Sequence, residues 1–138
     1  MTEDARTIAQ HLHLVPHPEG GFYRETYRSP LEVRPPGYPG TRALATVILF
    51  LLPADVRSAR HRVRSDELWL WQGGEAMALD VDGITNFVGP HVGGNQTLQH
   101  LVPADAWQSA TPAGSTWSLV ACVVAPGFDF ADFELAPT

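Results

Sequence analysis

The chain has 138 residues, enough to bury the core of one domain without disulfides, and its single cysteine, Cys122, excludes an internal disulfide. It contains no lysine, which excludes Schiff-base chemistry. The formal net charge of −6 disfavours nucleic acid and anionic membranes as partners.

Charge is divided along the chain. All nine arginines lie at or before Arg64, whereas residues 65–138 carry nine carboxylates and no arginine or lysine. Because both parts must pack into one small domain, the sequence predicts complementary charge pairs, either within the chain or between subunits.

The N-terminal residues 1–14 are predicted to carry one short helix, from Glu3 to Leu12. Apolar residues recur there at helical spacing: Ala5, Ile8, Ala9 and Leu12. The segment is acidic and lacks the apolar core of a secretory signal, so a cytoplasmic protein is expected. A turn rich in proline and glycine then ends the helix at residues 15–21.

Residues 15–138 are predicted to form a β-barrel, which makes residues 1–138 a single domain. A loop is expected at Ser29–Gly40, and the dipeptide Asp82-Gly83 predicts a hairpin turn. Strands are predicted at residues 22–27, 42–52, 57–63, 67–72, 76–81, 85–88, 96–102, 107–110, 115–124 and 128–135. Many short strands separated by Gly, Pro and Asp turns are typical of an all-β sandwich or jelly-roll barrel.

The last predicted strand changes its alternation. Phe128 and Phe130 share one parity, whereas Phe133 and Leu135 share the other. An extra residue near Ala131-Asp132 would return all four to one face, so a bulge or break is predicted there.

The segment from His61 to Glu67 is the strongest candidate for chemistry. On an extended chain His61 and Val63 share one face, and the intervening arginines share the other. Burying those arginines would be costly, so His61 and, after a turn, Glu67 are expected to point into the barrel. We expect them to form a hydrogen-bonded polar pair in an aromatic cavity.

This spacing resembles the first motif of the cupin superfamily, with His61, Glu67 and Gly74 in register. Val63 stands where that motif has its second histidine, and Asp55 where it has its first glycine. In the second motif Pro103 matches, whereas Asp105 replaces a glycine and Gln108 replaces a histidine.

A closer resemblance, to a branch of small single-domain cupins, covers nearly the whole chain. It is carried by the strings Pro16–Tyr27, Ser65–Trp69, Val102-Pro103 with Trp107-Gln108, and Val124–Phe128. The resemblance implies a double-stranded β-helix barrel, a homodimer, and a pocket similar to that of metal-independent nucleotide-sugar epimerases. The branch often has a histidine after the Trp of its Asp-Glu-x-Trp string, where this chain has Leu70.

The resemblance places the metal-ligand positions at His61, Val63, Glu67 and Gln108. Valine cannot ligate and an amide oxygen is a weak ligand, so no cofactor is expected. Weak binding of a divalent metal by His61, Glu67 and Gln108 is the remaining metal hypothesis.

Two functions stay open for this small-molecule pocket. The first is a cofactor-independent isomerase or epimerase of a carbohydrate-like substrate, with His61, Glu67 and Tyr23 as catalytic acid–base groups. The second is a ligand-binding barrel without turnover, and a metal-dependent oxygenase is a third, weaker candidate. In each case the expected ligand-binding residues are Gln108, Arg24, Tyr27, Trp69 and Trp71.

Overall fold

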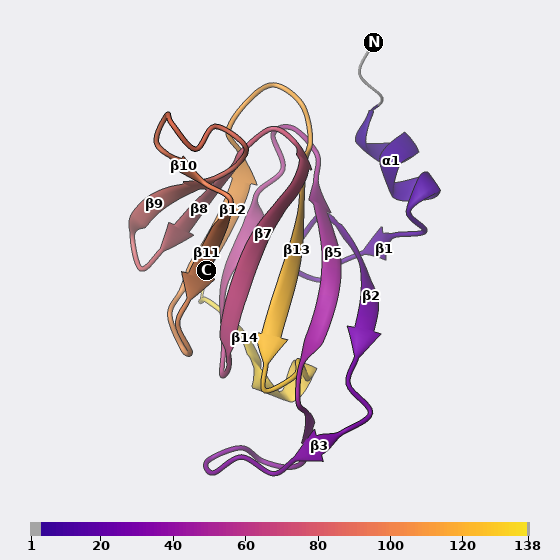
Figure 1. Ribbon diagram of the computed structural model, residues 1–138, viewed down its shortest axis with the longest axis vertical. Helices are drawn as coiled ribbons and strands as arrows, with labels where there is room; N and C mark the ends of the chain where they lie inside the picture. The colour runs from indigo at the N-terminus through magenta and orange to yellow at the C-terminus, as the bar shows by residue number, and fades with distance from the viewer. Residues whose placement is uncertain (1–3, 138) are drawn as a thin grey trace.

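The structure is a computed structural model, and it describes residues 4–137 of the chain. A short helix, α1 (Ala5–His11), begins at Asp4, whose side chain caps it by accepting a hydrogen bond from the Thr7 amide. The rest is a β-barrel of two sheets (Figure 1). None of the helices among the described residues is long and apolar enough to cross a membrane.

The first sheet has six strands in the order β1-β2-β5-β13-β7-β11. Their bounds are β1 (Val15–Pro16), β2 (Phe22–Arg28), β5 (Thr46–Leu52), β13 (Ser118–Ala125), β7 (Asp66–Gly74) and β11 (Gln99–Val102). Strands β5, β13 and β7 lie in its middle and are paired on both sides.

The second sheet also has six strands, in the order β10-β9-β8-β12-β6-β14. Their bounds are β10 (Gln96–Thr97), β9 (Ile84–Val88), β8 (Met77–Val81), β12 (Gln108–Pro112), β6 (Ser58–Val63) and β14 (Phe133–Leu135). The short strands β3 (Glu32–Val33) and β4 (Arg42–Ala43) pair separately.

The core lies between the sheets. Alternate residues of each central strand point inward, and the largest buried side chains include Phe50, Leu52, Trp69, Met77 and Leu79. This arrangement confirms the prediction of an all-β jelly-roll barrel with a short N-terminal helix.

Several predicted elements differ in their bounds. The helix is described from Ala5 to His11, while Glu3 lies outside the described residues. The strand predicted at 42–52 is interrupted between β4 and β5, and the one at 96–102 between β10 and β11. The predicted loop at 29–40 contains β3, and the Asp82-Gly83 hairpin is confirmed, with Val81 opposite Ile84.

The break predicted near Ala131-Asp132 is confirmed. A 3-10 turn, η1 (Phe130–Asp132), interrupts the C-terminal segment, and β14 begins only afterwards, at Phe133. The single buried face expected from it does not form, because Phe130 and Leu135 are both 48% exposed.

Candidate functional site

A small cavity of about 30 Å³ lies between the two sheets. Its ionisable lining side chains include His17, Glu19, His61 and Glu67, and the rest of the wall is largely aliphatic and aromatic. By volume it has room for only one or two water molecules. The cavity therefore suits a small polar group rather than a whole substrate-sized molecule.

Strands β6 and β7 bring His61 and Glu67 into this cavity, as the charge argument predicted. Side chains of His61, Val63 and Glu67 are buried, while Arg60 and Arg64 on the same segment are exposed. A register irregularity in the pairing of β12 with β6 lies just before His61. The arginines thus set the direction in which His61 points.

Glu19 is a central member of the site, and the sequence analysis did not select it. Its carboxyl is buried, and Oε1 accepts a 2.7 Å hydrogen bond from the Ser58 hydroxyl. Its other oxygen, Oε2, lies 3.2 Å from His61 Nε2. The expected direct pair of His61 with Glu67 is therefore corrected: Glu19 approaches the imidazole nitrogen, and Glu67 bonds elsewhere.

One shared proton connects Glu19 and His61. Burial raises the pKa of Glu19 to about 8, partly offset by the Ser58 hydrogen bond, so the carboxyl is protonated near neutral pH. Burial lowers the pKa of His61, opposed by the Ala59 carbonyl and by Glu67. The Ala59 carbonyl lies 2.7 Å from His61 Nδ1 and can only accept, so Nδ1 carries the proton of the neutral ring. Nε2 then presents its lone pair to the Glu19 carboxyl.

His17 is held neutral beside this pair. Its Nδ1 accepts a 3.1 Å hydrogen bond from the Glu19 backbone amide, which leaves its proton on Nε2. Burial, followed by the proximity of His61, lowers the pKa of His17 to about 4. The 3.8 Å approach of His17 Nδ1 to Glu19 Oε2 is therefore a contact of neutral groups at neutral pH and not an ion pair.

Glu67 belongs to a second polar chain, which links β7 to β12. The Trp69 indole N–H donates to Gln108 Oε1 at 3.0 Å, and because an indole can only donate, this fixes the amide orientation. Gln108 Nε2 then donates to Glu67 Oε1 at 2.9 Å. Burial raises the pKa of Glu67, and the Cys122 thiol lies beside its carboxyl. All four side chains are buried.

The residues at the cupin ligand positions do not fit a catalytic metal. Val63 offers no donor atom, and the Gln108 oxygen is already used by Trp69. Glu67 accepts from Gln108, and His61 Nε2 faces Glu19. Within residues 4–137 no group of three or more His, Cys, Asp or Glu is placed to hold a metal ion.

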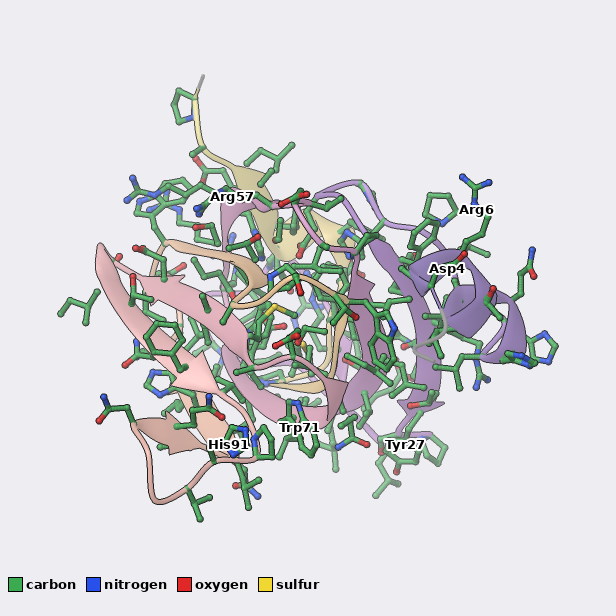
Figure 2. The ribbon with its side chains drawn as sticks, turned by 90° about the horizontal axis from the view of Figure 1, so that it is seen from above. Asp4, Arg6, Tyr27, Arg57, Trp71 and His91 are labelled. Carbon is green, nitrogen blue, oxygen red and sulfur yellow. The ribbon has the colours of Figure 1, made fainter. Side chains whose placement is uncertain are left out.

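Tyr23 and Trp69 line the cavity as expected, whereas Gln108, which is buried behind Glu67, does not, and neither do three further predicted ligand-binding residues. Arg24 is exposed, and its Nε donates to the Leu12 carbonyl at 2.9 Å. Tyr27 is 51% exposed and points away from the barrel (Figure 2). A bulge between Glu25 and Tyr27 is the cause, because one extra residue reverses the face on which Tyr27 lies.

Trp71 is the third of these residues. It packs against the hydrophobic core cluster, and its indole N–H donates to the carbonyls of Gly74 and Glu75, at 3.3 Å each. As predicted, Trp71 lies on the core side of β7. Its indole, however, points toward Gly74 at the end of the same strand and not into the cavity.

A sequence signal for Glu19 existed, in the string Pro16-His17-Pro18-Glu19-Gly20-Gly21. Gly21 has a φ of 78°, and a side chain there would lie 2.6 Å from the Leu51 carbonyl. Gly21 therefore lets the turn pack closely against β5. This packing places Glu19 inside the barrel, next to Ser58. A carboxylate directly before a glycine pair in a turn is the pattern that marks it.

The barrel, with its buried acid–base groups at the motif positions, defines a cupin. A sequence model of the cupin superfamily (DUF985) matches residues 6–136, so the chain belongs to this family.

Solved structures agree with this membership. A hypothetical protein from Leishmania major is 32% identical, with a TM-score of 0.90 over 97% of this chain and 88% of that one. A protein from Shewanella oneidensis is 34% identical, with a TM-score of 0.86 over 98% of this chain and 85% of that one. KdgF from Halomonas sp., at 13% identity and a TM-score of 0.62 over 86% of this chain and 91% of that one, shares the fold alone. No curated protein matches the chain.

Proposed function

We propose that the cavity binds the carbonyl end of a small molecule and that Glu19 and His61 transfer protons at it without a metal. One observation carries the proposal: a buried carboxyl with its pKa raised to about 8 lies 3.2 Å from the lone-pair nitrogen of a buried imidazole. Such a pair holds one proton that either partner can carry, which suits general acid–base catalysis near neutral pH.

The chemical step is an enolisation. Glu19 donates its proton to the ligand carbonyl oxygen, and His61 Nε2, released from that hydrogen bond, accepts a proton from the adjacent carbon. The ligand becomes an enol, and the pair becomes carboxylate and imidazolium. When His61 returns its proton to a different carbon and the enol gives a hydroxyl proton back to Glu19, an isomer forms and the pair is restored. Protonation of the other face of the same carbon needs a second acid, for which Tyr23, which also lines the cavity, is the candidate; the proton held by His61 then passes through solvent to the tyrosinate.

Cavity size restricts the substrate. A whole sugar ring exceeds 30 Å³, so a carbohydrate-like substrate would place only its carbonyl end inside. Its body would lie in the adjoining groove, which shares Tyr23, Ile48 and Phe128 with the cavity and adds Arg28 and Phe130.

Binding without turnover is the second candidate, and a specific observation favours it. Both carboxyls already have protein partners, since Ser58 bonds to Glu19 and Gln108 bonds to Glu67. Satisfied buried groups of this kind also occur in purely structural networks. The third candidate, a metal-dependent oxygenase, is disfavoured by the donor set and predicts a stoichiometric transition metal in elemental analysis of the purified protein.

The test begins with a thermal-shift screen of small carbonyl metabolites, because a ligand of the folded state raises the melting temperature. Each hit is then incubated with the protein in D₂O, and deuterium at the carbon beside its carbonyl is followed by NMR. Proton transfer predicts exchange that is abolished in His61→Asn and in Glu19→Gln while binding persists. If ligands raise the melting temperature but take up no deuterium, the barrel binds small molecules without catalysing proton transfer.

We also propose that the protein is a homodimer that uses the outer face of the first sheet. Most outward residues of β5, β13, β7 and β11 are apolar, with Gln99 as a polar exception, whereas a solvated antiparallel sheet normally has a polar outer face. These residues are Val47, Leu49, Leu68, Leu70, Leu101, Leu119, Ala121 and Val123.

A further inference from the structure

The C-terminal residues 128–133, called the strap below, form part of the cavity wall. Phe128 and Phe133 line the cavity, and the Phe133 ring stacks on His61 with ring centroids 5.1 Å apart. Figure 1 shows the strap as the yellow turn at the lower end of β13. The strap therefore covers the imidazole that the proposed chemistry uses.

Part of the wall must move before more than a small polar group enters, because the cavity has only about 30 Å³. Most other lining residues lie on β5, β7 and β13, which are each hydrogen-bonded to strands on both sides. Displacing one of these strands would break two ladders. The strap has no strand pairing between Phe128 and Asp132, and the Arg64 amide donates one backbone hydrogen bond to its Asp132 carbonyl at 3.2 Å, so its displacement disrupts few backbone bonds.

The two ends of the strap are anchored. At its start the Phe128 amide donates to the buried Thr46 hydroxyl at 2.9 Å, and Arg28 donates to the Phe128 carbonyl at 3.1 Å. At its end Phe133 pairs with Val63 as β14 joins β6. Movement is thereby confined to the part between the anchors, where the rings of Phe128 and Phe130 pack edge to face at 4.8 Å.

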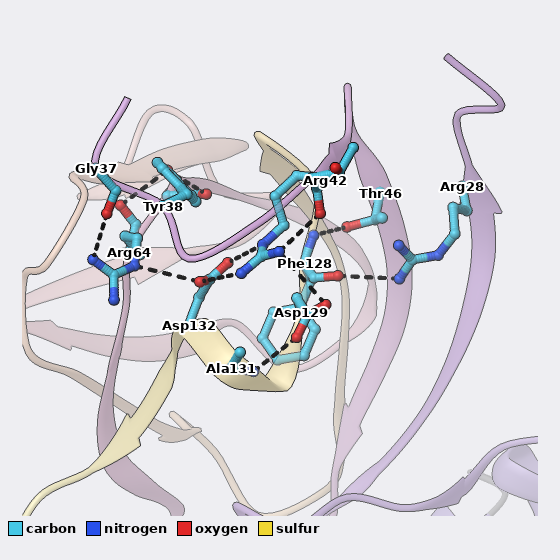
Figure 3. A network of polar contacts seen from close by, with 12 residues as sticks. Arg28, Gly37, Tyr38, Arg42, Thr46, Arg64, Phe128, Asp129, Ala131 and Asp132 are labelled. Atoms are coloured by element: carbon cyan, nitrogen blue, oxygen red, sulfur yellow. Dashed lines mark hydrogen bonds and ion pairs between the residues drawn. The ribbon is translucent and has the colours of Figure 1, made fainter. Parts of the chain in front are cut away.

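One carboxylate holds the middle of the strap. The Asp132 side chain is fully buried and accepts two hydrogen bonds from Arg42, at 2.8 Å from Nε and 2.9 Å from Nη2 (Figure 3). Arg64 Nε donates to the same carboxylate at 3.3 Å. Both arginines also lie over the Tyr38 ring, at 5.9 Å and 5.7 Å from its centroid. We call Arg42, Arg64 and Asp132 the clasp.

We propose that the strap is the lid of the cavity, and that the clasp holds it closed over His61. Ligand access then requires the clasp to open while the barrel stays folded, and the size of Phe128 and Phe133 limits what enters. This inference concerns access to the cavity, so it stands whether the ligand is turned over or only bound.

Cys122 provides a direct measure of opening. It is the chain's only cysteine, it is 1% exposed, and it lines the same cavity as Phe128 and Phe133. The rate at which methyl methanethiosulfonate modifies its thiol therefore reports how often the cavity opens, and Cys122→Ser supplies the blank. The free energy of unfolding of each variant, measured in urea, separates lid opening from global unfolding.

Two arginines of β6 and its following turn form a matched pair for this experiment. Arg64, with its side chain 42% exposed, bonds to Asp132 inside the strap, whereas Arg62, 38% exposed, bonds to Glu134 beyond it. Each also lies over an aromatic ring, Tyr38 for Arg64 and Trp107 for Arg62. Arg64→Gln should speed modification roughly fivefold at urea concentrations too low to unfold the protein, and Arg62→Gln should leave the rate at the wild-type value.

Asp132→Asn removes the shared charge and should speed modification by roughly a hundredfold or more. If that variant fails to fold, the comparison of Arg64→Gln with Arg62→Gln decides alone. Equal rates of Cys122 modification in wild type and both arginine variants would contradict the proposal that the strap is a lid. So would rates that rise with urea as steeply as global unfolding does, because the thiol would then be reached through unfolding.

Discussion

Glu19 illustrates how one buried residue links stability to chemistry. Its carboxyl has no cationic partner in the folded protein: His61 beside it is neutral and Ser58 contributes one hydrogen bond. Keeping an acid protonated in this way creates a proton donor at neutral pH. The same environment makes ionisation of Glu19 costly, which makes the folded state sensitive to alkali.

The pH dependence of stability follows from the pKa of Glu19, about 8 in the folded protein against 4.5 as the ordinary value. Between these values the folded state keeps a proton that the unfolded chain has released, so raising the pH favours unfolding. His17, with its pKa lowered to about 4, acts in the opposite direction, but only below its ordinary value of 6.5. From pH 6.5 to 8 we therefore expect stability to fall.

Glu19→Gln should flatten that fall. One proton contributes a slope of up to about 1.4 kcal/mol per pH unit, and the variant loses this contribution while Glu67, whose pKa is also raised, keeps its own. Urea unfolding at pH 6.5, 7.25 and 8 measures the slope. The exposed Glu32→Gln serves as the control and should follow wild type. A Glu19→Gln slope equal to that of wild type would show that Glu19 is ionised in the folded protein.

At the scale of elements, the end of β7 depends on a glycine. Gly74 has a φ of 72°, and a Cβ there would overlap both the carbonyl and the ring of Trp117. Gly83 in the β8–β9 hairpin has a φ of 90° but open space around it. The two glycines thus share the left-handed backbone and differ in packing.

Gly74→Ala should consequently destabilise the protein by about 3 kcal/mol or more, because backbone strain adds to the clash with Trp117. Gly83→Ala, with the strain alone, should cost only about 1 kcal/mol. The free energies of unfolding of the two variants give the comparison. Equal losses would mean that β7 and β13 separate easily at this end and that Gly74 is not required by packing.

Local patterns were sufficient to predict much of the fold. The exposed arginines beside His61 determined which face of β6 is buried, and the parity change between Phe130 and Phe133 located η1. The bulge that turns Tyr27 outward was not predicted, because the local alternation of β2 is regular and only its register with β5 shows the extra residue. Pairing register is a property of two strands and cannot be read from one.

The sequence predicted which residues belong to the site better than which of them contact one another. Motif spacing selected His61, Glu67 and Gln108, which are all buried. The partner of His61 was not predicted, because Glu19 is far away in sequence and reaches the cavity through a turn with no periodic pattern. Contacts between a turn and a strand depend on how the whole barrel closes.

For the whole molecule, part of the division of charge is resolved inside the chain. Carboxylates near the C-terminus pair with arginines of the first half: Asp132 with Arg42 and Arg64, and Glu134 with Arg62. The sequence left pairing within the chain and pairing between subunits both open, and these contacts are within the chain. These charge pairs lie on β4, β6, η1 and β14, so none of them occupies the apolar outer face of the first sheet.

That face leads to the last prediction, on the oligomeric state. Leu101 of β11 and Leu68 of β7 lie opposite each other in the ladder and are 46% and 37% exposed. If a second copy covers them, Leu101→Glu would bury a charge without a partner and should convert the protein to a monomer. Analytical ultracentrifugation at micromolar concentration should then give 15.1 kDa for the variant and twice that mass for wild type.

Ile84 provides the control, since it is 69% exposed on β9 in the other sheet. Ile84→Glu changes the same kind of side chain in the same way but lies outside the proposed interface, so it should sediment as wild type does. A wild-type mass of 15.1 kDa would show that the protein is a monomer and would contradict the dimer proposal. Loss of the dimer in Ile84→Glu, with Leu101→Glu unaffected, would instead move the interface to the second sheet, because only a residue at a contact surface can change the mass through its charge.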